Sequence, residues 1–331
     1  MMSPRAFALC FVAILAALLA GTMAANVAID PEAVFGTHPD APRANANSRY
    51  TRFNAYRDGS ERPDGVLFAS SRGTGFDPAA LARALGVNGI ANFSVNYGMV
   101  TDHLPVLEYL IREKAARGER LRSVLLMVDV DHFGKAPWTN SNLDGFLPPE
   151  VSGEHPARFW WRYLTAFQFR VWRTTIGGEP GRRADLAVPA MRAAIIPPLM
   201  LPEPRLVRAA AERPERRYDI VQRPQLEAHL ALLARMAAVS RAHGVTLTVV
   251  TSPLNRLNAR DYDPAELARV AERIARAVPL WDFGVPDWLS DRGELWNDPS
   301  HFKPAVGDLM LDRVFGAGGA APPGFGTLRT R

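Results

Sequence analysis

The sequence predicts an α/β protein built on a three-layer, doubly wound parallel sheet, because short apolar runs alternate with amphipathic helical segments along most of the chain. The clearest run, LRSVLLMVDV at 121–130, is almost continuously apolar, as expected of a strand that helices cover on both faces. Two segments lie outside the alternation. One is an uncharged N-terminal stretch at 6–29, and the other is rich in Pro, Arg and aromatic residues at 134–223.

Strands and helices are expected in alternating order from about residue 65 onward. Asp77 is placed to cap the helix that starts at Pro78, and Gly244 is placed to end a later one. In such a sheet the crossovers are right-handed, and sites form beyond the carboxyl ends of the strands. The expected strands are 65–70, 89–95, 121–130, 245–252 and 279–283, and the expected helices are 78–85, 101–117, 225–243, 264–277 and 304–315.

The N-terminal segment 1–29 predicts a signal anchor that crosses a membrane once. Its apolar run is longer than the roughly 18 residues that identify a spanning helix. Arg5 precedes the run, so the N-terminus is expected in the cytoplasm and the folded part outside, giving an inner-membrane protein with a periplasmic domain. A cleavable signal peptide is the alternative, because Thr22-Met23-Ala24 resembles a cleavage site. Cys10 lies inside the run rather than after it, which argues against a lipoprotein.

After the anchor we expect a polar linker at 30–60 and one domain at 61–331, which carries the insertion at 134–223. The insertion contains ARFWWRYLTAFQFRVWR at 157–173, which predicts an aromatic helix. Packing on the core is the first interpretation of such a helix, because aromatic side chains most often serve cores. The alternatives are a position in the membrane interface, where Trp, Tyr and Arg are favoured, and a lid or partner-docking surface over an active site.

Composition excludes several classes of function. The 331 residues carry a net charge of +5, and Lys114, Lys135 and Lys303 are the only lysines among 39 basic residues. No basic cluster alternates with stacking aromatics in a known nucleic-acid fold, so no nucleic-acid partner is expected. Cys10 is the single cysteine, which excludes an intrachain disulfide and a cysteine-based zinc site.

The first expected strand runs into FASSRGTGFDP, which places Ser71 at the functional edge of the sheet. A serine at a strand-to-helix turn exposes its hydroxyl and lies near backbone amides that can stabilise an oxyanion. ASSRG also resembles the G-x-S-x-G elbow of α/β-hydrolases, but the order of residues in this chain argues against that class. Ser71 could instead be only a turn residue, and Arg72 beside it could hold a substrate carboxylate or pair with an acid.

The stretch LWNDPSHF at 295–302 places Asp298 and His301 three positions apart, just before the last expected helix. One interpretation is chemical, with His301 as a general base and Asp298 as the residue that orients it. The other is structural, with Asp298 and Ser300 as capping residues before a helix that starts at Pro304.

Two clusters of carboxylate and imidazole invite a metal interpretation. They are Asp129, Asp131 and His132 after the third strand, and the pair Asp102 and His103. Successive side chains of an extended strand point to opposite faces, so the first cluster is not expected to converge on one ion. We expect neither a metal nor a cofactor.

Three blocks in this order resemble the SGNH (GDSL-type) hydrolase family. They are ASSR at 69–72, NFSVNYGMVTDH at 92–103 and DPSH at 298–301, and the resemblance extends over about 65–130 and 245–315. It implies a flavodoxin-like sheet, with Ser71 as nucleophile, His301 as base and Asp298 as orienting acid. It also implies an oxyanion site formed by Ser71, Gly98 and Asn96. The chain is most similar to the membrane-anchored, exported branch that accompanies teichoic-acid D-alanine transfer and alginate O-acetylation.

One block departs from this pattern. The family has an oxyanion-binding Asn after its third strand, whereas this chain has Asp129 near that place. An ionised carboxylate cannot donate a hydrogen bond. Asn92 or Asn96 is available as a substitute. The departure argues against ordinary lipase-type activity and suits the acylation-associated branch.

The resemblance and the anchor together imply an exported serine acyl-ester enzyme, an O-acyltransferase or esterase that acts on a cell-envelope glycan or acyl-lipid. The alternative is a non-catalytic accessory protein that docks a membrane-bound acyltransferase or binds polysaccharide. An intact Ser71, Asp298 and His301 set favours the enzyme, whereas Asp129 and the aromatic insertion favour the accessory protein.

Overall fold

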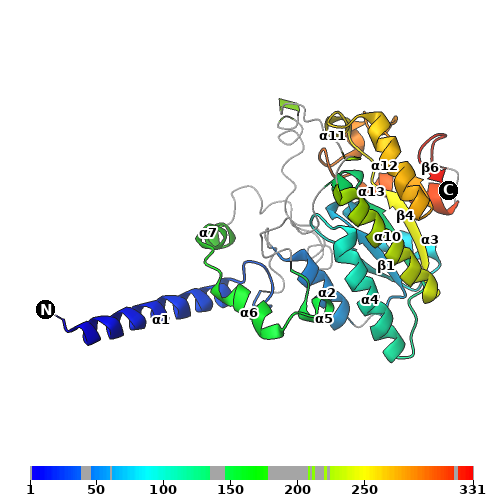
Figure 1. Cartoon of the computed structure of the whole chain (residues 1–331). Coiled ribbons are helices and arrows are strands. Elements are labelled where there is room, and N and C mark those ends of the chain that lie inside the picture. The colour runs from blue at the N-terminus through cyan, green and yellow to red at the C-terminus, as the bar shows by residue number, and fades with distance from the viewer. Residues whose placement is uncertain are drawn as a thin grey trace. The chain divides into compact units, whose positions relative to one another are not determined.

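The computed structural model describes residues 2–38, 46–59, 62–134, 146–177, 208, 211–212, 220–221, 224–316 and 320–330. The chain forms two compact units, which are described one at a time (Figure 1). Unit 1 contains Met1–Thr51 and Asn140–Leu199, and unit 2 contains Arg52–Thr139 and Met200–Arg331.

Unit 2 is an α/β unit with a six-stranded mixed sheet of order β2-β1-β3-β4-β5-β6. The first five strands are parallel, as the alternation predicts, and β6 is antiparallel to β5. A wholly parallel sheet was therefore wrong at one edge. The sequence signal was missing because β6 is short and partly exposed, so it has no apolar run. The strands are β1 Gly65–Ala69, β2 Ile90–Ser94, β3 Ser123–Val128, β4 Thr246–Thr251, β5 Leu280–Asp282 and β6 Thr327–Arg329.

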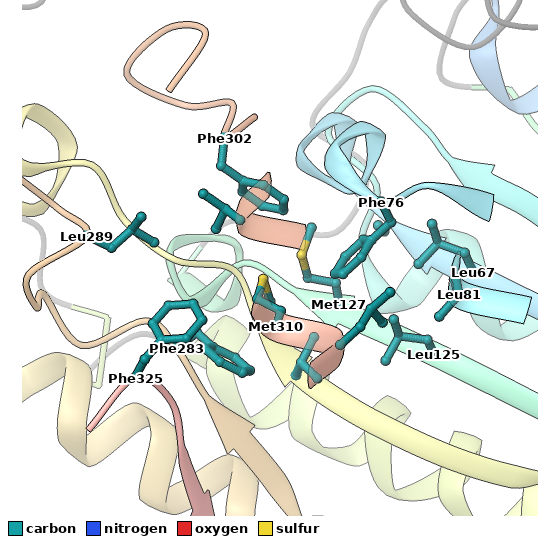
Figure 2. Close-up of a cluster of buried hydrophobic side chains, with 14 of the residues drawn as sticks. Leu67, Phe76, Leu81, Leu125, Met127, Phe283, Leu289, Phe302, Met310 and Phe325 are labelled. Carbon is teal, nitrogen blue, oxygen red and sulfur yellow. The ribbon is translucent and has the colours of Figure 1, made fainter. Parts of the chain in front are cut away.

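The helices of unit 2 pack in two groups. Leu67 and Leu125 lie in one buried cluster with residues of α3 and α13 (Figure 2). Phe68 points to the opposite face of the sheet from Leu67, and its ring stacks on that of His103 in α4. Helix α10 contacts α4 and α12. The bounds are α3 Pro78–Leu85, α4 Val100–Ala116, α10 Pro224–Ala242, α11 Arg256–Ala259, α12 Pro264–Ala277 and α13 Pro304–Phe315.

The segment at 30–60 differs from the expected linker, because it contains helix α2, Ser48–Asp58. Phe53 of α2 is fully buried, and its ring meets that of Tyr109 edge-on in unit 2. The polar composition of α2 hid these contacts, since only a few of its residues face the core.

Unit 1 contains α1 Pro4–Ile29, α5 Pro149–Ser152, α6 Pro156–Thr165 and α7 Phe169–Gly177. Helix α1 is long and apolar enough to span a membrane, with a mean hydropathy of 2.4 and no buried part in that window. The single aromatic helix expected at 157–173 is divided between α6 and α7 by a break at 166–168. Most of the insertion expected at 134–223 lies outside the described residues.

Helix α13 lies against η1, the 3-10 turn Ser71–Gly75 that follows β1 by one residue. A Cβ atom on Gly307 of α13 would lie 2.4 Å from the carbonyl oxygen of Gly75. This contact between a helix and a backbone carbonyl has no room for a side chain.

We predict that Gly307→Ala destabilises the protein by about 1–3 kcal/mol, because overpacking against backbone outweighs the better helix propensity of Ala. Gly293→Ala is the control, since a Cβ there meets nothing within 4 Å. Urea unfolding of the detergent-solubilised chain measures both effects. Equal midpoints for the two variants would show that the contact is not tight.

Candidate active site

Ser71 lies where β1 turns into η1. Strand β1 ends at Ala69, and the side chain of Ser70 accepts a hydrogen bond of 3.2 Å from the Arg72 amide. Ser70 therefore caps η1, and Ser71 is the first residue of the turn. Its side chain is partly exposed, whereas Ser70 is buried. The serine with the accessible hydroxyl is the one that the sequence predicts.

The stretch LWNDPSHF forms a loop with an apolar residue fixed at each end. Trp296 and Phe302 pair as an isolated antiparallel bridge, and both side chains are buried in one apolar cluster, in which Figure 2 labels Phe302. The Asn297 amide donates to the His301 carbonyl at 2.8 Å, which closes the loop. Its polar middle carries Asp298 and His301. The two apolar anchors therefore determine where the polar pair lies.

The structure brings Ser71, His301 and Asp298 into one chain of hydrogen bonds. His301 Nε2 lies 3.0 Å from Ser71 Oγ, and His301 Nδ1 lies 2.7 Å from Asp298 Oδ2. The serine and the histidine are 230 positions apart in the sequence. These separations are those at which a base removes a proton from a nucleophile while an acid holds the ring.

Asp298 does not cap α13. The N-cap residue of that helix is Lys303, which makes no side-chain capping bond. Asp298 Oδ1 instead accepts from the amides of Ser300 at 2.7 Å and His301 at 3.0 Å, so it caps the turn within its own loop. The interpretation of Asp298 as a capping residue was right in that its side chain accepts from backbone amides. It was wrong in that these amides belong to its own loop and not to α13.

The surroundings of Asp298 favour its charged form. Burial by itself would raise the pKa of Asp298, but bonds from His301 and the two loop amides outweigh burial and hold that pKa below its usual range. The carboxylate is therefore ionised at neutral pH. It fixes the His301 ring and would stabilise positive charge on it.

Arg72 pairs with acids of its own chain. Its Nη1 lies 3.3 Å from Asp129, 3.1 Å from Asp131, and 3.1 Å from Ser252 Oγ. Burial alone would lower the pKa of Arg72 and raise that of Asp129, but their ion pair reverses both shifts. Asp129 is therefore held as a carboxylate, which cannot donate a hydrogen bond to an oxyanion.

The two clusters that invited a metal interpretation differ in the structure. Asp129, Asp131 and His132 do bring three ligand atoms within 4.8 Å of one another. The expectation that they diverge was wrong, because residues 130–134 form the 3-10 turn η2 and not an extended strand. The cation that both carboxylates contact is the guanidinium of Arg72. Asp102 accepts from the Met99 amide at 2.9 Å and so caps α4.

The expected oxyanion residues follow β2. The Gly98 amide donates to the Val95 carbonyl at 3.0 Å, so this amide is already engaged. A Cβ on Gly98 would lie 2.5 Å from the Ala69 carbonyl oxygen, so close packing against β1 is enough to explain a glycine at this position. Asn96 is partly exposed after the same strand. Asn92 Oδ1 accepts from the Ser94 amide within the strand.

Sequence reasoning missed Tyr97, which lies between the two expected oxyanion residues. Its φ is 51°, which is uncommon for a bulky residue, and the residue is 62% exposed. Backbone strain of this kind concentrates at functional sites. The signal was the tripeptide Asn96-Tyr97-Gly98, which places an aromatic residue in a loop between an expected strand and an expected helix.

No family model matches the sequence, and no curated protein matches it at a significant level.

We predict that Arg72→Gln costs about 3–5 kcal/mol, because it leaves the buried Asp129 carboxylate and the partly buried Asp131 carboxylate without the guanidinium that pairs with both. Adding Asp129→Asn removes one of those charges, so the double variant should regain part of the loss. Arg256→Gln is the control, since its pair with Asp291 is exposed and such pairs contribute about 1 kcal/mol or less. Urea unfolding measures all three, and strictly additive effects would contradict the coupling.

We predict that Asp298→Asn flattens the acid limb of the stability curve. Because the folded pKa of Asp298 is below its unfolded value of about 3.9, its stabilisation is present above that pH and is lost as pH falls through the folded pKa. The parent should therefore lose stability more steeply on acidification than the variant. Unfolding midpoints between about pH 6 and pH 2 test this, and parallel curves would refute it.

Proposed function

We propose that this chain is an exported, membrane-anchored serine acyl-ester enzyme of SGNH-like fold that acts on a cell-envelope saccharide. The proposal depends on one observation, the continuous hydrogen-bonded chain from Ser71 through His301 to Asp298. A three-layer, doubly wound sheet of SGNH type is part of the proposal. The parallel strands and the serine after the first of them support it.

Each residue has one role in the reaction. His301 Nε2 takes the Ser71 proton as Oγ attacks the acyl carbonyl, and Asp298 stabilises the imidazolium that forms. The imidazolium returns the proton to the leaving alcohol, which leaves an acyl-serine. An acceptor hydroxyl, from water or a sugar, then gives its proton to His301 as its oxygen attacks the acyl carbon, and the acyl–Oγ bond breaks as His301 returns that proton to Ser71. Both half-reactions conserve protons, so no cofactor is needed.

The oxyanion needs donors other than residue 129. The Ser71 amide is the first in η1, and the first amides of a helical turn have no partner within it. Asn96 supplies a side-chain amide in the loop after the neighbouring strand. An oxyanion site with fewer donors than usual suits an enzyme that receives an already activated acyl group.

The nature of the acceptor separates a transferase from an esterase. An exported protein meets envelope glycans but no soluble acyl-CoA, so a transferase would receive its acyl group from a membrane-bound acyltransferase or an acyl-lipid. Tyr97 offers an exposed aromatic face on which a sugar ring could rest. We therefore propose acyl transfer to a saccharide, with removal of acyl groups as the reverse use of the same site.

A fluorophosphonate probe tests the serine. The parent should be labelled at Ser71, and Ser71→Ala should abolish labelling. His301→Ala should slow labelling by a factor of about 10² or more, as loss of a general base does. Ser152→Ala, at an exposed serine of α5, is the control that should label normally. A parent that is never labelled would contradict catalysis.

A small activated acetyl ester distinguishes the reactions. With an oligosaccharide present, the transferase is expected to form an acetylated sugar that depends on Ser71. Release to water at a rate that the sugar does not change would identify an esterase.

The non-catalytic accessory role remains the second candidate, because the Asp129 carboxylate and the engaged Gly98 amide both weaken an oxyanion site. Binding of the oligosaccharide without labelling or turnover would identify that role.

A further inference from the structure

The C-terminal end of α1 is bound to the connection between α6 and α7 in unit 1. The Asn26 side-chain amide donates to the carbonyls of Leu164 and Ala166, each at 2.9 Å. Asn26 Oδ1 accepts from Trp172 Nε1 at 2.8 Å. Asn26 is 1% exposed, so its amide group is fully used in a buried setting. Breaking these bonds would leave buried polar atoms unpaired, which is costly.

The chain that follows α1 also holds its last turn. Thr37 Oγ1 donates to the Val27 carbonyl at 3.0 Å, and a His38 ring nitrogen lies 2.8 Å from the Ala28 carbonyl. Asp30 ends the helix in a left-handed conformation and accepts from the Val34 amide. The end of α1 is thus built into unit 1, whereas the end of a cleaved leader would need no such contacts.

The length of α1 places these contacts near a membrane surface. Its 26 residues span about 39 Å at about 1.5 Å each, and the hydrocarbon core of a bilayer takes about 20 of them. Counted from Pro4, the segment left over begins near Ala24 and includes Asn26. In Figure 1, α6 and α7 lie at this end of α1, opposite the end marked N.

Large apolar side chains are exposed at the same place. Phe167, in the connection that Asn26 holds, is 74% exposed, and Phe169, the first residue of α7, is 64% exposed. Phe169, Trp172 and Ile176 share one face of α7 by their spacing, and Ile176 is 67% exposed. By contrast, Phe159 and Tyr163 of α6 are buried in the small core of unit 1. The aromatic segment therefore has a core part and an exposed part.

We propose that the exposed side chains of Phe167, Phe169 and Ile176, together with the partly exposed Trp172, form a second membrane contact that lies in the outer headgroup region of the bilayer crossed by α1. The lipid surface is its occupant because the patch belongs to α7 and the connection before it, and α7 contacts α1, which is long and apolar enough to cross a bilayer. Aromatic side chains are favoured at that depth, and Arg173 beside Trp172 suits anionic headgroups. The inference requires α1 to span the bilayer but does not depend on the Ser71 chemistry.

Depth-dependent fluorescence quenching tests the proposal in the full-length chain. Cys10 is exposed on α1 and is the single cysteine, so an environment-sensitive dye on it reports whether α1 spans the bilayer. In a Cys10→Ala background, Phe167→Cys carries the dye on the proposed contact. Ser152→Cys, at an exposed position of α5 in the same unit, is the matched control. The vesicles contain phosphatidylethanolamine and phosphatidylglycerol with spin labels at headgroup or mid-chain depth.

We expect the dye at position 167 to be quenched about threefold more by headgroup labels than by mid-chain labels, since interfacial side chains lie roughly 5–10 Å into the boundary. The dye on Cys10 should show the opposite order, and the dye at position 152 should not be quenched. No quenching at position 167 alongside a quenched Cys10 would overturn the contact. An apolar dye spectrum there without lipid quenching would mean that protein covers the patch, which also overturns it.

The variant Asn26→Leu provides a second test of the proposal. It removes the bonds to Leu164, Ala166 and Trp172 but leaves α1 apolar. Quenching of the dye at position 167 should fall about twofold or more as the aromatic connection is released, because lipid quenching is lost within the roughly 5–10 Å of interfacial depth. Quenching at Cys10 should persist. Unchanged quenching at both positions would show that Asn26 does not hold this surface at the membrane.

Discussion

The burial of Phe302 against the turn that carries the serine is the contact on which the site depends. Phe302 meets Phe76 edge-on at 5.9 Å, and Gly75 lies so close that a Cβ there would be 2.3 Å from the Phe302 ring. His301 is the next residue back along the chain. The apolar core therefore sets the distance between a base and a nucleophile from opposite ends of the domain. A hydrogen bond of 3.0 Å requires this precision, since polar attraction alone would not hold two loops in one geometry.

An ion-pair network of Arg72 is a second constraint on the turn that carries the serine. Arg72 follows Ser71 directly, and its guanidinium is held by two carboxylates from the end of β3 and by Ser252 after β4. The backbone of the nucleophile turn is thus tied to two neighbouring strands by charge as well as by packing. The same arrangement keeps Asp129 ionised and removes it as an oxyanion donor. One ion-pair network therefore stabilises the turn and limits its chemistry.

Unit 1 shows how a small core can organise the segment that follows a long apolar helix. Asn47 donates to the Tyr163 hydroxyl and to the Phe146 carbonyl, and these bonds join parts of the chain more than 90 positions apart. Tyr50, Phe159 and Tyr163 fill the space between them. The exposed aromatic side chains next to Asn26 are left outside this core. Exposed apolar side chains of this kind are unfavourable on a surface that faces water and favourable on one that faces lipid.

Local sequence determined most of the elements, because each carries its own signal. The helices at Pro78–Leu85, Pro264–Ala277 and Pro304–Phe315 begin and end as expected, since a proline marks each start and an Asp side chain caps the first two. The buried strands were equally plain from their apolar runs. Helix α2 and strand β6 were missed because their stability comes from partners distant in the sequence.

The residues of the site were also visible in the sequence, but their geometry was not. The sequence by itself determined that Ser71 follows the first strand and that Asp298 and His301 share a short polar stretch before the last helix. Only the tertiary structure decided that Asp298 orients the imidazole rather than capping α13, that Arg72 pairs with Asp129 and Asp131, and that the Gly98 amide is engaged. The physical reason is that hydrogen bonds and ion pairs act over about 3 Å, and folding alone brings such distant residues that close.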